Sequence, residues 1–164
     1  MMNRTWMKTG AGAAALAMAM PAFGTPDDRW LDTPTGWTYL YGATTAQIGN
    51  LVSDGQRIFN IERLGANSYN AIGVTNSGAY SITGMQTIYS QTGASLSNYL
   101  DSNNRRIIDL EPYENGGTEN FAAITVPNTG ATGAGWGWLY RTSPGAIDDW
   151  IDNANPPLRL IDMD

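Results

Sequence analysis

Residues 106–111 read Arg-Ile-Ile-Asp-Leu-Glu, and related stretches occur twice more along the chain. Residues 57–62 read Arg-Ile-Phe-Asn-Ile-Glu, and residues 159–164 read Arg-Leu-Ile-Asp-Met-Asp. In each stretch, successive side chains alternate between two faces, as they do in a β-strand. The spacing of about 50 residues is typical of a repeat protein, in which one supersecondary unit is copied along the chain.

Two further blocks recur in the same order as this one. Residues 71–78 return at 123–130, where a β-branched stretch is followed by the turn sequence Pro-Asn-Thr-Gly. Residues 37–41, which read Trp-Thr-Tyr-Leu-Tyr, return at 85–89 and again, with two tryptophans, at 136–140. We expect each of these blocks to form a strand. In the block at 136–140, the three aromatic side chains would share one face.

A short segment with helical spacing follows each aromatic block. Its apolar side chains lie at positions i, i+3 and i+4, which places them on one face of a helix. These side chains are Ile48, Leu51 and Val52; Leu96, Tyr99 and Leu100; and Ile147, Trp150 and Ile151. A residue with a hydroxyl group precedes each set and is suited to cap the helix: Thr44, Thr92 and Ser143. Pro144 fits the first helical position, and we place Trp150 in the core.

The predicted unit is therefore strand, helix, strand, strand. The predicted fold class is α+β, with tandem repeats of about 50 residues in an open solenoid or a partial propeller-like array. We place repeat 1 at 36–83, repeat 2 at 84–134 and a partial repeat 3 at 135–164. Because the third repeat lacks a counterpart of the last strand, we expect the chain to be part of a longer array. Pairing of the edge at 159–164 with another chain is the alternative.

The first 24 residues have the pattern of a secretory signal peptide. Arg4 and Lys8 give a positive start, an apolar run follows, and small residues precede a cleavage point after Gly24. The apolar run is too short for a membrane span, which needs about 20 residues. Residues 25–35 are expected to be a linker. We therefore expect a secreted protein, extracellular or periplasmic, with no membrane span after removal of the signal.

Composition excludes most reaction mechanisms. The chain has no His and no Cys, and its one lysine, Lys8, lies in the predicted leader. Nucleophile pairs with His, thiolate zinc sites, P-loops and Schiff bases are therefore excluded from the mature chain. Removing the two leader cations from a net charge of −6 leaves −8. A chain this acidic should repel phosphate backbones, so we expect no nucleic acid partner, and no cofactor is predicted.

Two carboxylates of the arginine block, Asp109 and Glu111, are candidate functional residues. A pair of carboxyl groups about 5–10 Å apart could hydrolyse a glycan by acid and base catalysis. Because carboxylates recur at the same repeat position, we favour a structural role, accepting hydrogen bonds from arginines or from backbone N–H groups. The oxygen-rich loop at 111–120 lacks the spacing of an EF-hand, so a hairpin turn is favoured over a calcium site.

Aromatic side chains of the first strand in each repeat form the second candidate group. Trp37, Tyr39, Trp136 and Trp138 could stack on sugars or peptides. They could equally fill the space between one repeat and the next, and we favour this packing role. The predicted ligand-binding residues are these four with Asp109 and Glu111, and no catalytic or metal-binding residue is assigned.

Several of these blocks together resemble a known family. The aromatic strand ending in Leu-Tyr, the capped helix, residues 106–113 and residues 121–130 resemble the bacterial tandem repeat family whose modules also form the N-terminal part of polyglycine hydrolases. The resemblance covers about residues 36–164. It implies a secreted accessory region, with activity in a separate C-terminal β-lactamase-like serine domain. The Ser-x-x-Lys motif of such a domain does not occur in the mature chain.

The leading functional expectation is a secreted, non-catalytic repeat module for binding or spacing. The expected partners are further repeats, a C-terminal hydrolase domain, or a glycan or protein at a cell surface. One alternative is a small secreted hydrolase that uses carboxylates. A lectin-like carbohydrate-binding module is the other alternative.

Overall fold

The computed structural model describes residue 34 and residues 36–154, and within them the fold is α+β. The described residues form two three-stranded antiparallel sheets and three α-helices, which confirms the α+β class but does not test the predicted open solenoid or propeller-like array. The predicted signal peptide, most of the predicted linker and the third arginine block at 159–164 lie outside the described residues.

The first segment, residues 36–83, contains the first sheet. Its strands are β1 (Trp37–Ala43), β2 (Gln56–Gly65) and β3 (Ser68–Thr75), and the helix α1 (Thr45–Ser53) connects β1 to β2. A 3₁₀ turn, η1 (Gly78–Tyr80), follows β3. The order of strands across the sheet is β1-β3-β2, so β2 is an edge strand.

The second segment, residues 84–134, contains the same elements in the same order. They are β4 (Gln86–Gln91), α2 (Gly93–Ser102), β5 (Arg105–Asn115), β6 (Thr118–Pro127) and the 3₁₀ turn η2 (Gly130–Thr132). The order of strands is β4-β6-β5, which matches the first sheet strand for strand. The predicted order strand, helix, strand, strand therefore occurs in both segments.

The third segment, residues 135–154 of the described chain, contains the helix α3 (Pro144–Asp152) but no strand. The predicted strand at 136–140 is therefore wrong. In both sheets the first strand hydrogen-bonds to the third, as β1 does to β3 and β4 to β6. In the described part of the chain no third strand follows α3, so residues 136–140 lack the ladder partner that a strand requires.

All three predicted helices begin with the predicted cap. Each cap residue accepts a hydrogen bond from the backbone N–H three residues later: Thr44 from Gln47 at 3.3 Å, Thr92 from Ser95 at 3.3 Å and Ser143 from Ala146 at 3.2 Å. Two residues before each cap the backbone has a positive φ, at Gly42, Ser90 and Arg141. The chain therefore enters each helix by the same sharp change of direction.

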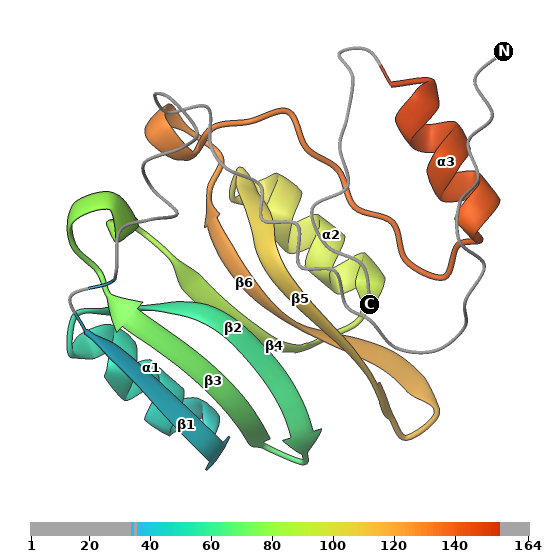
Figure 1. The fold of residues 1–164 in the computed structure, drawn as a ribbon. Helices are drawn as coiled ribbons and strands as arrows, with labels where there is room; N and C mark the ends of the chain where they lie inside the picture. Colours follow the sequence, from blue (N-terminus) through green and yellow to red (C-terminus); the bar gives the residue numbers. More distant parts are fainter. Residues whose placement is uncertain (1–33, 35, 155–164) are drawn as a thin grey trace, which may run out of the picture.

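Two hydrophobic clusters form the core. The first cluster lies between the two sheets and joins α1 and the first sheet to Met85, Ala122, Ile124 and Val126 of the second segment. The second cluster joins α2 and the second sheet to Trp136 and Trp138 of the third segment. Figure 1 shows the result, with the first sheet, the second sheet and α3 following one another across the molecule.

Trp150 is not in the core, contrary to the prediction. It is half-buried, and α3 contains no buried residue. A Cβ atom placed on Gly137 would lie 2.6 Å from the Trp150 ring, so this side chain lies against the backbone of the preceding loop. The physical reason is that the described residues of the third segment include no sheet for α3 to cover.

Candidate functional site

Asp109 and Glu111 lie on β5 and reach across to the edge strand β2 of the first sheet. Asp109 Oδ2 accepts the backbone N–H of Ile61 at 2.9 Å, and Asp109 Oδ1 accepts the side-chain amide of Asn60 at 3.3 Å. Glu111 Oε1 accepts the backbone N–H of Arg63 at 3.0 Å. Hydrogen bonds between a carboxylate and backbone N–H groups are strong because one partner is charged. These side chains therefore connect the second segment to the first.

Burial restricts what Asp109 can reach. Its side chain is only 4% exposed, and both of its carboxylate oxygens accept hydrogen bonds from β2. General acid or base catalysis needs a carboxyl group within hydrogen-bond reach of the substrate. The arrangement at Asp109 provides a structural acceptor, and it leaves little surface on which a sugar could lie.

Aromatic contacts also join the first and second segments, at a contact region that we call the first junction. The guanidinium carbon of Arg63 lies 4.1 Å from the centre of the Tyr113 ring, and the Tyr113 hydroxyl donates to Ser90 Oγ at 3.0 Å. The rings of Tyr69 and Tyr89 are 5.0 Å apart. Burial, followed by the neighbouring Tyr113 hydroxyl, raises the pKa of Tyr69 to about 12. The junction therefore favours the neutral form of Tyr69.

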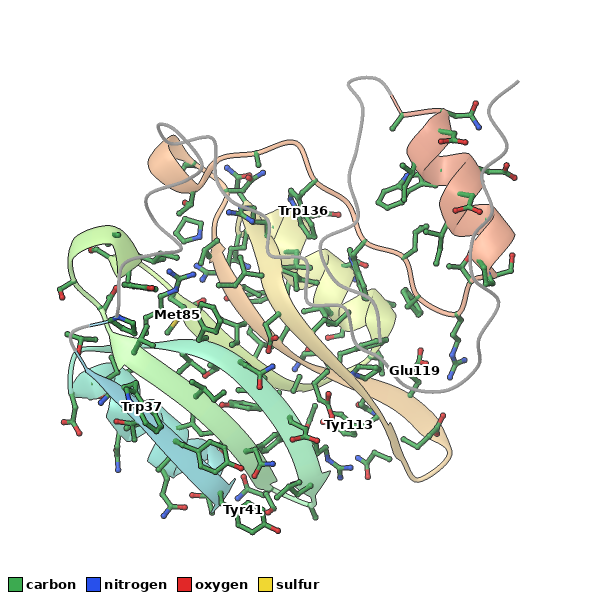
Figure 2. All side chains as sticks on the ribbon, viewed as in Figure 1. Trp37, Tyr41, Met85, Tyr113, Glu119 and Trp136 are labelled. Carbon is green, nitrogen blue, oxygen red and sulfur yellow. The ribbon has the colours of Figure 1, made fainter. Side chains whose placement is uncertain are left out.

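Trp136 and Trp138 form a corresponding junction between the third segment and the second. Both side chains are half-buried and pack on the second hydrophobic cluster. The Trp138 ring lies edge-on to Phe121 at 5.4 Å and stacks on Tyr140 at 4.9 Å. A Cβ atom on Gly93 would overlap the Tyr140 ring, so glycine permits this close approach. Trp136, labelled in Figure 2, lies beside α2.

Trp37 and Tyr39 have no such covering in the described structure. Their side chains are 70% and 50% exposed, and Tyr41 on the same strand is 77% exposed. Trp37 pairs with Val74 and Tyr39 with Ile72 across the β1–β3 ladder. The structure therefore separates the six candidate residues: Asp109, Glu111, Trp136 and Trp138 lie at junctions, and Trp37 and Tyr39 lie on an open face.

Three buried or half-buried arginines have roles that were not assigned from the sequence. Arg105 donates to Thr125 Oγ1 at 2.9 Å and to the carbonyl oxygen of Gly84 at 2.7 Å. Arg106 donates to the carbonyl of Thr132 at 2.7 Å, and Arg57 donates to the carbonyl of Tyr80. Burial lowers the pKa of both Arg57 and Arg106. The recurrence of arginine at 57 and 106 was the sequence signal for the bonds to Tyr80 and Thr132, which fix the two 3₁₀ turns.

The loop at 111–120 forms the hairpin that was favoured over a calcium site. Strands β5 and β6 pair up to Asn115 and Thr118, and the connecting Gly116 and Gly117 both have positive φ. Among the described residues, no group of three or more acidic side chains is placed to hold a metal ion. In the same part of the chain, no helix combines the length and the apolar character that crossing a membrane requires.

Comparison of the chain with protein-family models, with curated proteins and with solved structures finds no match.

Proposed function

We propose that this chain is a secreted, non-catalytic module of tandem strand-helix-strand-strand repeats that serves in binding or spacing. The recurring sequence blocks support this proposal, as do the identical strand orders of the two sheets. Successive units would stack in an open array, each covering an apolar face of the one before it. The leader-like pattern of residues 1–24 supports secretion.

The single observation that carries the non-catalytic role is the position of Asp109. Both of its oxygens bind β2, and it is 4% exposed. Asp109 and Glu111, the candidate carboxylates for a hydrolase, thus connect the second segment to the first. The absence of His and Cys from the sequence, and of Lys after residue 8, supports the same proposal because it removes other nucleophile and base combinations.

We further propose that the module is the accessory region of a polyglycine-hydrolase-like or β-lactamase-like serine hydrolase. The sequence resemblance of residues 36–164 supports this role. The DNA downstream of the Asp164 codon tests it, because an open reading frame with a Ser-x-x-Lys motif is expected there. A stop codon immediately after Asp164 would contradict the proposal.

A double substitution tests the non-catalytic role. We expect the wild-type chain to show no turnover of a panel of glycans and peptides. Asp109→Asn with Glu111→Gln should lower the thermal midpoint, because charge-assisted bonds to Ile61 and Arg63 are weakened. Glu114→Gln is the matched control, since this carboxylate is exposed at the end of β5. Wild-type turnover that the double variant abolishes, with an unchanged thermal midpoint, would contradict the proposal.

The exposed aromatic side chains of β1 favour a second candidate function, lectin-like sugar binding. Trp37 and Tyr39 lie on one face of the strand, and such rings stack on the apolar faces of sugars. Glycan-array binding that is lost in Trp37→Ala would support it. Binding that survives Trp37→Ala with Tyr39→Ala would exclude this face as a sugar site.

A further inference from the structure

The outer edge of β2 is the surface on which the second segment docks at the first junction. Asp109 and Glu111, which alternate along β5, accept the backbone N–H groups of Ile61 and Arg63, which alternate along β2, at 2.9 Å and 3.0 Å. Alternate residues of a strand point to the same side, so this spacing lets two carboxylates of one strand bind two N–H groups of another. The edge strand is thus recognised by a segment that carries acidic residues at alternate positions.

The outer edge of β5 is the corresponding surface of the second sheet. Across the described residues β5 is the edge strand of the order β4-β6-β5, as β2 is of the order β1-β3-β2. Ile61 pairs with Ala71 and Leu110 with Ala123, and each ladder has a register shift just before this pair. Because the two ladders repeat residue for residue in this stretch, the N–H of Leu110 points away from β6, as the N–H of Ile61 points away from β3.

The two edges differ at the next outward position. Arg63 pairs with Tyr69 in the first sheet, and Pro112 stands at the corresponding place opposite Phe121 in the second. Proline has no N–H to donate, and it is tolerated on edge strands for that reason. The outer edge of β5 therefore offers the N–H of Leu110 without a second donor at the position of Arg63. A segment that docks in this stretch needs one well-placed acceptor rather than two.

The sequence contains a third block of the type that docks on β2. Residues 159–164, which lie outside the described residues, place Asp162 where residues 106–111 place Asp109. The block follows α3 after six residues, whereas its counterparts follow α1 and α2 after three. Figure 1 shows the second sheet between the first sheet and α3. The connection from α3 is therefore longer than those that bring β2 and β5 beside their own helices.

We propose that residues 159–164 of the same chain occupy the outer edge of β5, with the Asp162 carboxylate accepting the backbone N–H of Leu110. This inference rests on the proposed repeat array and names the segment that covers its last described sheet. The other two copies of the block already form parts of β2 and β5, which leaves residues 159–164 as the copy available within the chain. A charged acceptor makes a strong hydrogen bond to a backbone N–H, so no fourth strand is needed at this edge.

Charge distinguishes this contact from the first junction. There, the Asn60 side-chain amide donates to Asp109 Oδ1 at 3.3 Å, so an amide faces a carboxylate. At the edge of β5, Asp109 holds the position of Asn60, and Asp162 holds the position of Asp109, so two carboxylates meet. Like charges that lie close together disfavour the charged forms of both groups. We therefore expect Asp162→Asn, which keeps an acceptor oxygen and removes one charge, to strengthen the contact.

Amide hydrogen exchange, followed by NMR on the mature chain, tests the contact at Leu110. Asp162→Ala should speed exchange of the Leu110 N–H by about tenfold or more, because an amide that loses its partner exchanges more freely with solvent. The Ile61 N–H should keep its wild-type rate, which would show that the fold and the first junction are intact. Asp162→Asn should protect Leu110 at least as well as the wild type does. Asp148→Ala is the matched control, since this aspartate is exposed on α3.

Three results would overturn the inference. The Leu110 N–H could exchange at the same rate in Asp162→Ala and in the wild type, which would show that Asp162 does not hold it. Its protection could rise with protein concentration, which would place the docked segment on another copy of the chain. Asp162→Asn could lose as much protection as Asp162→Ala, which would exclude the acceptor oxygen as the cause. None of these results bears on the turnover test of the proposed function, which substitutes Asp109 and Glu111 instead.

Discussion

Asp109 accepts the backbone N–H of Ile61 at 2.9 Å, although the two residues belong to different sheets. Ile61 is 2% exposed and Asp109 is 4% exposed, so water does not compete freely for this bond. Since β2 is an edge strand within residues 36–154, its outward N–H groups have no neighbouring strand to bind there. The carboxylate supplies the acceptor that a fourth strand would otherwise provide.

The first prediction concerns this acceptor. Asp109→Ala should lower the free energy of unfolding by about 1–3 kcal/mol, because the buried N–H of Ile61 loses its partner. Asp109→Asn keeps an acceptor oxygen and should cost less. Urea denaturation measures both changes, with Glu114→Ala as an exposed control on the same strand. Equal stability of Asp109→Ala and the wild type would show that the junction does not depend on this bond.

The second prediction is a dependence of stability on alkaline pH. The pKa of Tyr69 is about 12 in the folded chain and about 10 when unfolded, so its stabilising contribution is complete below pH 10. It is lost as the pH rises from 10 to 12, because the unfolded chain ionises first. In Tyr69→Phe, which resembles Phe121 at the corresponding position, the free energy of unfolding should fall less over this range. If the free energy of unfolding declined equally in the wild type and in Tyr69→Phe, the raised pKa of Tyr69 would be contradicted.

The third prediction concerns the close approach of Tyr140 to α2. Gly93→Ala should destabilise the chain by about 1–3 kcal/mol, because the added methyl group overlaps the Tyr140 ring. Combined with Tyr140→Ala, the same substitution should become neutral or stabilising. Gly49→Ala in α1 is the matched control, since its Cβ meets nothing within 4 Å and should stabilise the helix by about 0.5–1 kcal/mol. Additive effects of Gly93→Ala and Tyr140→Ala would exclude this contact.

The fourth prediction concerns the helix caps. Thr92→Ala removes the oxygen that accepts the N–H of Ser95 and should cost about 1 kcal/mol. Ser102→Ala, at the other end of the same helix, should change stability by less than about 0.5 kcal/mol. Thermal denaturation compares the two variants. A larger loss from Ser102→Ala than from Thr92→Ala would contradict the capping role.

Local features of this fold were predictable from the sequence because they depend on neighbours along the chain. The caps at Thr44, Thr92 and Ser143 are examples, since each bond spans three residues. The acceptor role of Asp109 was favoured in advance, but its partner Ile61 was not identified. That partner depends on how two sheets stack, which no local pattern encodes.

The third segment shows where pattern reasoning fails. Alternating aromatics at 136–140 predicted a strand, yet the described chain provides no partner strand for them. The Trp138 and Tyr140 rings still contact Phe121, as expected for side chains that share one face. The periodicity thus predicted this shared face correctly and the hydrogen bonding wrongly, because ladder formation depends on a second segment. The sequence also could not distinguish the open row at Trp37 from the packed one at Trp136, since the two positions carry the same residue type.

The edge of β2 has a consequence for aggregation. Unpaired edge strands are templates on which other chains add strands, and this is how amyloid fibrils grow. Here the carboxylates of Asp109 and Glu111 occupy the N–H groups of Ile61 and Arg63 that an incoming strand would need. Each added unit would therefore block the edge strand in the sheet of the unit before it. An array built in this way could lengthen while keeping its sheets at three strands, which separates growth by stacking from growth into fibrils.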